Sequence, residues 1–142
     1  MTTRVLVVDD EQEIRELLDR HLRYLGYTVH CAENGQDALE KLSAVRTDIV
    51  ISDIGMPVMN GIELLGRIRS EFPMTRVVMI TGFVSQENVL ACMRGGAEIC
   101  IFKPLEDLEV LEQAVTRATE ALARWWAALG ELRSLKSESP AA

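Results

Sequence analysis

Residues 5–10 read VLVVDD, an apolar, largely β-branched run that ends in two acids. Further short apolar runs recur at 27–31, 49–51, 77–80 and 99–102. Most are continuously hydrophobic, which is typical of strands buried on both faces of a parallel sheet. The run at 27–31 alternates apolar and polar residues, as expected of an edge strand with one wetter face. The sequence therefore predicts five strands.

Helical patterns fill the intervals between these runs. Apolar residues recur at steps of three or four over 14–25, 38–42, 62–68 and 89–93. Strand and helix thus alternate along the chain, which predicts parallel strands joined by right-handed crossovers, with helices on both faces. The expected fold class is α/β, a doubly wound five-stranded parallel sheet.

Composition limits the classes of partner. The chain has 142 residues, enough for one domain, and 48% of them are hydrophobic. Its net charge of −7 repels phosphate backbones, so we expect no nucleic acid bound by this chain. No apolar run is long enough to cross a membrane. Three cysteines without metal-ligand spacing suit a reducing compartment, and the expected location is the cytoplasm.

Polar residues stand directly after four of the predicted strands. In open α/β sheets, ligands bind beyond the carboxyl ends of the strands, so these side chains should meet in one crevice. Taken singly, each has an ordinary structural explanation as a turn, cap or surface residue. Their joint occurrence at the strand ends favours a functional site. The residues are Asp9, Asp10, Asp53, Thr81 and Lys103.

These residue types fit magnesium-assisted phosphoryl transfer. Clustered carboxylates repel one another unless a cation intervenes, and hard oxygen ligands suit Mg²⁺. A carboxylate left free could act as the nucleophile and form an acyl phosphate. Because such transfer depends on positioning and charge neutralisation, the metal, the Thr81 hydroxyl and the Lys103 ammonium could each serve one phosphoryl oxygen.

The same motifs carry a family resemblance over about residues 4–120. VLVVDDE (5–11), DIGMPVMNG (53–61), MITG (79–82) and FKP (102–104) are similar, in order and spacing, to the receiver domains of two-component response regulators. The resemblance implies the strand order 2-1-3-4-5. It also implies that Asp53 takes a phosphoryl group from a sensor histidine kinase or a phosphotransfer protein.

The resemblance assigns supporting roles as well. Thr81 would bind a phosphoryl oxygen, and Lys103 would pair with the phosphoryl group. Such a domain is a signalling switch, not an enzyme, because it promotes only its own phosphotransfer and dephosphorylation. The implied ligands of Mg²⁺ are Asp9, Asp10, Asp53 and the main-chain carbonyl of Gly55.

Two positions depart from the family pattern. Cys100 stands where relatives usually carry Tyr or Phe, so an aromatic switch at that position is not expected, and Phe102 on the same strand face is the candidate substitute. Gly55 stands where many relatives carry a polar side chain, which would leave the phosphoryl group open to water and its lifetime short. The peptide before Pro104 is expected to be cis, as in many relatives.

The last helical pattern is unusually long. Its apolar stripe, at steps of three and four from Leu108 to Leu132, continues past the expected end of the receiver domain. We therefore divide the chain into a receiver domain (1–120) and a helical extension with a flexible tail (121–142). The extended C-terminal helix is expected to pair with a second copy, forming a homodimer. The alternative is that it folds back or frays, because Gly130 weakens a helix.

Two other functions stay open. The chain could be a non-phosphorylated adaptor that keeps the fold for dimerisation, although an intact acidic pocket speaks against this. It could also be an aspartyl-phosphate phosphatase. Those enzymes typically need a second acid two residues after the nucleophile, where this chain has Gly55.

Overall fold

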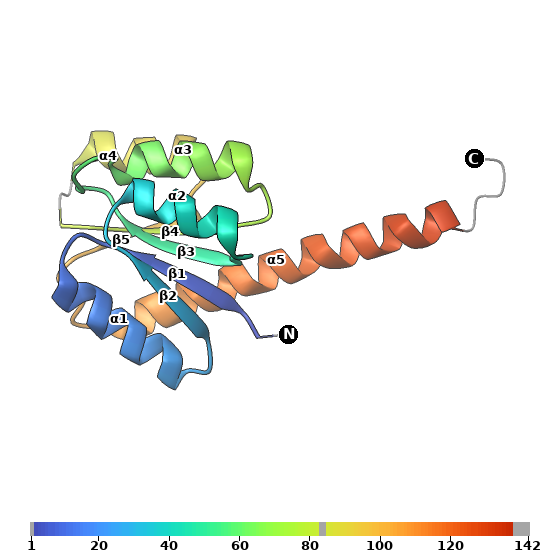
Figure 1. Cartoon of the computed structure of the whole chain (residues 1–142), viewed down its shortest axis with the longest axis horizontal. Helices are drawn as coiled ribbons and strands as arrows, with labels where there is room; N and C mark the ends of the chain where they lie inside the picture. Colours follow the sequence, from blue (N-terminus) through green and yellow to red (C-terminus); the bar gives the residue numbers. More distant parts are fainter. Residues whose placement is uncertain (1, 83–84, 138–142) are drawn as a thin grey trace.

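The computed structural model describes residues 2–82 and 85–137. Five parallel strands form one sheet in the order β2-β1-β3-β4-β5, and helices cover both faces, so the predicted fold is confirmed (Figure 1). The strands are β1 (Arg4–Val8), β2 (Thr28–Ala32), β3 (Ile49–Asp53), β4 (Arg76–Thr81) and β5 (Ile99–Phe102). The helices are α1 (Gln12–Tyr24), α2 (Gly35–Ala44), α3 (Gly61–Glu71), α4 (Gln86–Arg94) and α5 (Leu108–Ser137).

Alternate residues of each strand serve opposite faces of the sheet. Along β1, Val5 and Val7 pack into the cluster covered by α1 and α5, whereas Leu6 and Val8 pack into the cluster covered by α2, α3 and α4 (Figure 1). Both faces are apolar because both are covered, which explains the continuous hydrophobic runs. Among the described strands, β2 pairs with β1 alone, and His30 on β2 is exposed, as expected of an edge strand.

Side-chain caps fix where three of the helices begin. The Asn34 side chain accepts a hydrogen bond from the Asp37 N–H, Asn60 does the same for Glu63, and Ser85 accepts from the Asn88 N–H. Each cap satisfies one of the donors that a helix leaves free in its first turn. The chain therefore turns from strand to helix at defined residues.

Gly61 sets how closely α3 approaches the end of β3. A Cβ at this position would lie 2.1 Å from the main-chain oxygen of Asp53. The Gly61 N–H also donates to the Ile54 carbonyl, at 2.8 Å. Only glycine allows this close contact, and the contact holds the loop that follows Asp53 against the first turn of α3.

Helix α5 changes environment along its length. Leu111 and Val115 are buried against the sheet, and Leu122 further along the helix is also buried. Beyond them the helix continues away from the sheet, and Trp125 is 56% exposed although it lies on the same stripe (Figure 1). The predicted flexible tail at 138–142 lies outside the described residues. Among the described helices, none is both long and apolar enough to cross a membrane.

Candidate functional site

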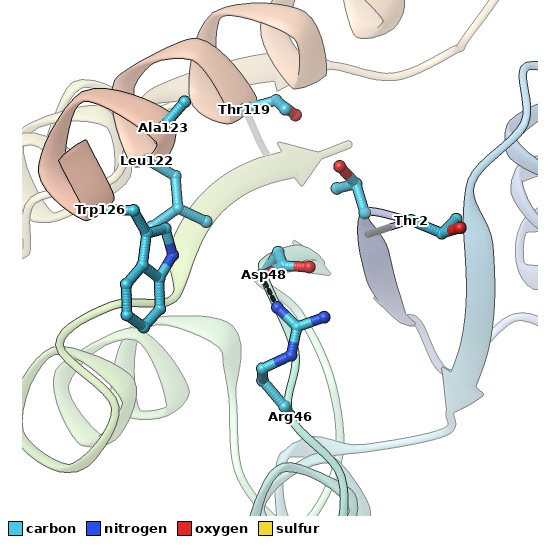
Figure 2. Close-up of a pocket in the computed structure, with 8 residues that line it drawn as sticks. Thr2, Arg46, Asp48, Thr119, Leu122, Ala123 and Trp126 are labelled. Atoms are coloured by element: carbon cyan, nitrogen blue, oxygen red, sulfur yellow. Dashed lines mark hydrogen bonds and ion pairs between the residues drawn. The ribbon is translucent and has the colours of Figure 1, made fainter. Parts of the chain in front are cut away.

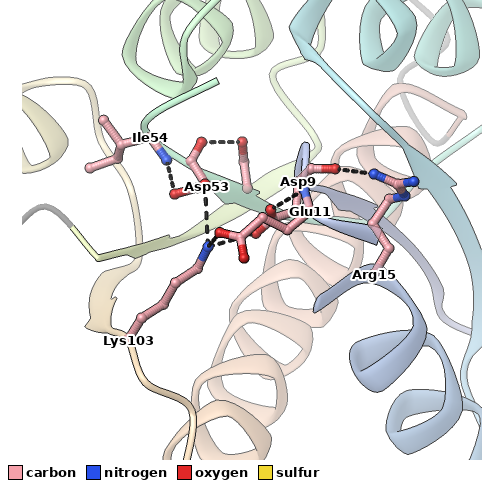
Figure 3. A network of polar contacts seen from close by, with 7 residues as sticks. Asp9, Glu11, Arg15, Asp53, Ile54 and Lys103 are labelled. Atoms are coloured by element: carbon pink, nitrogen blue, oxygen red, sulfur yellow. Dashed lines mark hydrogen bonds and ion pairs between the residues drawn. The ribbon is translucent and has the colours of Figure 1, made fainter. Parts of the chain in front are cut away.

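The carboxyl ends of β1, β3 and β5 bring two acids and a lysine together. The Lys103 Nζ lies 3.0 Å from Asp9 Oδ2 and 3.3 Å from Asp53 Oδ2 (Figure 3). It also lies 3.4 Å from Glu11 Oε1. One ammonium therefore compensates three carboxylates that come from two neighbouring strand ends.

Asp53 ends β3 and is almost fully buried, with 5% of its surface exposed. Its Oδ1 accepts a hydrogen bond from the Ile54 N–H, at 2.8 Å. Its main-chain oxygen accepts from the Ser52 hydroxyl, at 2.9 Å. With the Lys103 contact, both carboxylate oxygens have a donor, so the side chain is held in one orientation.

Asp9 follows β1 and has no exposed surface. Burial raises the pKa of its carboxyl group, and the nearby charge of Asp53 raises it further. Hydrogen bonds from the Glu11 N–H and from Lys103 act in the opposite direction and do not cancel the effect of burial. The ionised form of the Asp9 carboxyl group is therefore destabilised in the folded protein.

Lys103 follows β5, and only 13% of its side chain is exposed. Burial by itself lowers the pKa of the ammonium group, but the hydrogen bonds and charges of Asp9 and Asp53 outweigh burial, so the pKa is raised overall. The Lys103 N–H donates to the Thr81 carbonyl, at 2.8 Å, which ties the end of β5 to the end of β4. The peptide between Lys103 and Pro104 is cis, as expected.

The acids fit a hard divalent cation. One carboxylate oxygen from each of four residues lies within 4.8 Å of the others. Two of these residues are buried and two are exposed, so an ion could approach from solvent and be held against the strand ends. Carboxylate oxygens are the ligands that Mg²⁺ prefers. The residues are Asp9, Asp10, Glu11 and Asp53.

The other predicted site residues lie at the same edge of the sheet. Thr81 is fully buried at the end of β4, one position beyond Ile80, the register partner of Asp53. Gly55 is exposed in the loop after β3, and a Cβ added there would meet nothing within 4 Å. The space beside the Asp53 loop is therefore open.

Two residues of the site were not predicted from the sequence. Glu11 joins the acid cluster, and the Nη1 of Arg15 donates to the Asp9 carbonyl at 2.7 Å (Figure 3). The sequence feature that could have identified these two residues is their spacing from Asp9. Glu11 directly follows the Asp9-Asp10 pair, and Arg15 lies one helical turn further on, where its side chain points back to the helix start.

Cys100, which departs from the family pattern, and Phe102, its candidate substitute, lie on one face of β5. Cys100 packs against the cluster covered by α4, whereas Ile101 packs on the opposite face. Phe102 shares the face of Cys100 by strand alternation, is in register with Thr81 and is 46% exposed. An aromatic ring thus stands at the strand end next to Thr81.

Comparisons with known proteins agree with this geometry. The response regulator receiver domain family matches residues 5–116. The regulatory protein AtoC of Escherichia coli (strain K12) is 37% identical over 117 residues, covering 82% of this chain and 25% of that protein. The regulator of RpoS from the same strain is 39% identical over 112 residues, covering 79% of this chain and 33% of that protein.

Solved structures share the fold over nearly their whole length. The chemotaxis protein CheY4 of Vibrio cholerae is 34% identical with a TM-score of 0.76, covering 83% of this chain and 99% of that chain. The response regulator TrrA of Thermotoga maritima, solved in complex with Mg²⁺-BeF, is 34% identical with a TM-score of 0.75, covering 82% of this chain and 99% of that chain.

The curated relatives are longer than this chain, which spans a quarter of AtoC and a third of the regulator of RpoS. The match therefore concerns one domain of each relative. Sequence motifs, strand order and the acid–lysine group at the strand ends all agree with it, and the chain belongs to the response regulator receiver domain family.

Proposed function

We propose that this chain is a phosphorylation-controlled switch in which Asp53 accepts a phosphoryl group in a Mg²⁺-dependent reaction. Membership in the receiver family supports a phosphoryl-accepting signalling role. The observation that carries the assignment to Asp53 is its position in a buried group with Asp9 and Lys103. Receiver domains are signalling modules, so we assign no metabolite turnover to the chain.

The phosphoryl donor is a phosphohistidine of a sensor histidine kinase or phosphotransfer protein. An Asp53 carboxylate oxygen attacks phosphorus and forms a P–O bond as the P–N bond breaks. The electron pair of the P–N bond stays on the donor imidazole nitrogen, which takes up a proton from water. The Lys103 ammonium already lies within 3.3 Å of Asp53 and neutralises charge on the phosphoryl oxygens. The Thr81 hydroxyl, at the neighbouring strand end, binds another of these oxygens.

Magnesium is the cation that fits the acids. Asp9, Asp10 and Asp53, with the main-chain carbonyl of Gly55, would hold it at the strand ends. When bound, the ion neutralises negative charge on the acids and on the incoming phosphoryl group. The TrrA structure in complex with Mg²⁺-BeF supports this choice of metal.

The test is phosphorylation by a small-molecule donor. Incubation with acetyl phosphate and Mg²⁺ is expected to add one phosphoryl group to the intact mass. The Asp53→Asn variant, and the wild type with excess chelator, are expected to gain none. Unmodified wild-type protein would favour the adaptor function, and release of phosphate from unrelated esters would favour a phosphatase. The latter is disfavoured because Gly55 leaves no second acid two residues after Asp53.

We also propose that the extension at 121–142 pairs with a second copy through α5, as one route by which the receiver at 1–120 passes on its signal. The apolar stripe buried as far as Leu122 continues with Trp125, Leu129 and Leu132, which are 37–56% exposed. Exposed apolar stripes at this spacing are typical of helices that pair.

A hollow beside this stripe adds apolar surface for the partner. Its volume is about 370 Å³, and Leu122, Ala123 and Trp126 line one wall, facing the Arg46–Asp48 ion pair (Figure 2). Trp126 is 44% exposed. The surface around the exit of α5 from the sheet is thus broader than the stripe alone.

Light scattering across a concentration series, with and without beryllofluoride, tests this pairing. The wild type is expected to dimerise, more strongly with the phosphoryl mimic. Leu129→Asp is expected to be monomeric, while Ala127→Asp, on the same helix but off the stripe, behaves as wild type. A monomeric wild type at every concentration would refute the dimer and leave the phospho-acceptor function untouched.

A further inference from the structure

Arg15 reaches from the first turns of α1 back to the segment that carries the acids. Its Nη1 donates to the main-chain oxygen of Asp9 at 2.7 Å (Figure 3). The side chain is half-buried. A guanidinium so placed acts on the acid site through the backbone, without being a ligand itself.

The segment from Asp9 to Glu11 needs such support. Asp9 is anchored to the sheet by its N–H, which donates to the Ala32 carbonyl at 3.2 Å, and its carboxylate accepts from the Glu11 N–H and from Lys103. On the other side, Glu11 is the N-cap residue of α1, and its side chain makes no capping hydrogen bond. Asp10 lies between them and is exposed. Arg15 therefore fixes the peptide that leads from the buried acid to the exposed one.

The charge of Arg15 also affects the segment from Asp9 to Glu11. A hydrogen bond from a charged donor is about twice as strong as one between neutral groups. The Arg15 charge also offsets repulsion among Asp9, Asp10 and Glu11, whose carboxylates converge. The positive charge by itself disfavours a cation, so the positional and electrostatic effects on metal affinity have opposite signs and can be separated.

We propose that Arg15 is a positioning residue for the metal site, holding the Asp9–Asp10 peptide so that both carboxylates face one ion. The inference deepens the proposed function and rests on it. Residues that orient metal ligands without touching the metal typically change affinity about 10- to 100-fold when replaced. An Arg15 variant should accordingly bind Mg²⁺ more weakly even though it has lost a positive charge.

Titration calorimetry with MgCl₂, without any phosphodonor, tests this proposal. Arg15→Met is expected to weaken Mg²⁺ binding about tenfold. Arg15→Lys, which keeps the charge and one donor, should recover part of the loss. Arg20→Met, an exposed arginine on the same helix, removes the same charge and should bind as wild type or slightly more tightly.

Thermal unfolding without Mg²⁺ checks that each variant is folded. Unchanged Mg²⁺ affinity in Arg15→Met would overturn the proposal. Equal losses in Arg15→Met and Arg20→Met would also overturn it, because the loss of affinity would then not depend on the contact between Arg15 and the Asp9 carbonyl. If the wild type binds Mg²⁺ but is never phosphorylated, the proposed function fails while the role of Arg15 in metal binding stands.

Discussion

The Lys103 ammonium lies 3.3 Å from Asp53 Oδ2, with both side chains buried beside Asp9. Removing the lysine charge would leave two buried carboxylates without their cation. Loss of one partner from a buried ion pair typically costs about 3–5 kcal/mol. Lys103→Met should therefore lower the free energy of unfolding by about 3 kcal/mol, measured by urea denaturation without Mg²⁺.

The matched control is Lys41→Met, which removes a lysine from an exposed ion pair with Asp37 on α2. Exposed pairs of this kind contribute about 0–1 kcal/mol, so the control should stay close to wild type. Equal stability of the two variants would show that Lys103 does not compensate the buried acids.

Replacing Asp9 should raise the free energy of unfolding, whereas replacing Lys103 should lower it. Burial raises the pKa of its carboxyl group, so the ionised form is disfavoured in the folded protein. Asp9→Asn should consequently raise the stability at pH 7 by about 1 kcal/mol, or a few degrees in Tm, while Mg²⁺ binding is lost. Thermal melts with and without Mg²⁺ measure both effects.

The advantage of Asp9→Asn should depend on pH. Above the folded-state pKa, Asp9 is charged in both the folded and the unfolded protein, and the buried charge then lowers the free energy of unfolding by its full amount. As the pH falls through the raised pKa towards the ordinary value of 3.8, the folded protein takes up a proton and the difference between variant and wild type shrinks. A difference that grows on acidification would contradict this account.

Much of this arrangement could be predicted from the sequence. Continuous apolar runs give buried parallel strands, and residues directly after such strands must lie at one edge of the sheet. That reasoning brings Asp9, Asp53 and Lys103 together without coordinates. Glu11 and Arg15 could not be placed in the same way, because their contacts depend on the direction in which α1 leaves the loop.

Local backbone geometry was also beyond sequence reasoning. Val58 has a φ of 71°, in the left-handed region, although β-branched residues rarely adopt it. The sequence shows only an apolar residue after Pro57. The close approach at Gly61 is similar, since the spacing of the motif shows a glycine but not the atom that would meet its Cβ.

Gly61→Ala should strongly destabilise the protein. The added Cβ would lie 2.1 Å from the Asp53 oxygen, so α3 must move away from β3. We expect a loss of about 3 kcal/mol in urea denaturation and slower phosphorylation of Asp53, because its loop shifts. Gly66→Ala, on the same helix with nothing within 4 Å, should instead gain about 1 kcal/mol. Similar effects at both glycines would argue against the contact.

Val58→Gly should stabilise the loop after β3. The left-handed conformation costs an L-residue about 1–2 kcal/mol, and glycine adopts it without that cost. Because Val58 is 79% exposed, little buried contact is lost, and the greater freedom of unfolded glycine offsets only part of the gain. A net gain of about 0.5 kcal/mol is expected by urea denaturation. Val58→Ala, which keeps a Cβ, should gain less, and equal gains would exclude relief of strain.

Gly55→Asn should lengthen the lifetime of the phosphorylated protein. Gly55 is exposed two residues after Asp53, and a Cβ added there would meet nothing within 4 Å, so we expect water to reach a phosphoryl group on Asp53 from this side. An asparagine side chain would occupy part of that space and should slow hydrolysis several-fold. The decay of intact mass after removal of the phosphodonor, with Mg²⁺ present, gives the half-life. Gly55→Ala adds only a methyl group and is expected to fall between the two, whereas a half-life independent of the side chain at this position would show that access of water is controlled elsewhere.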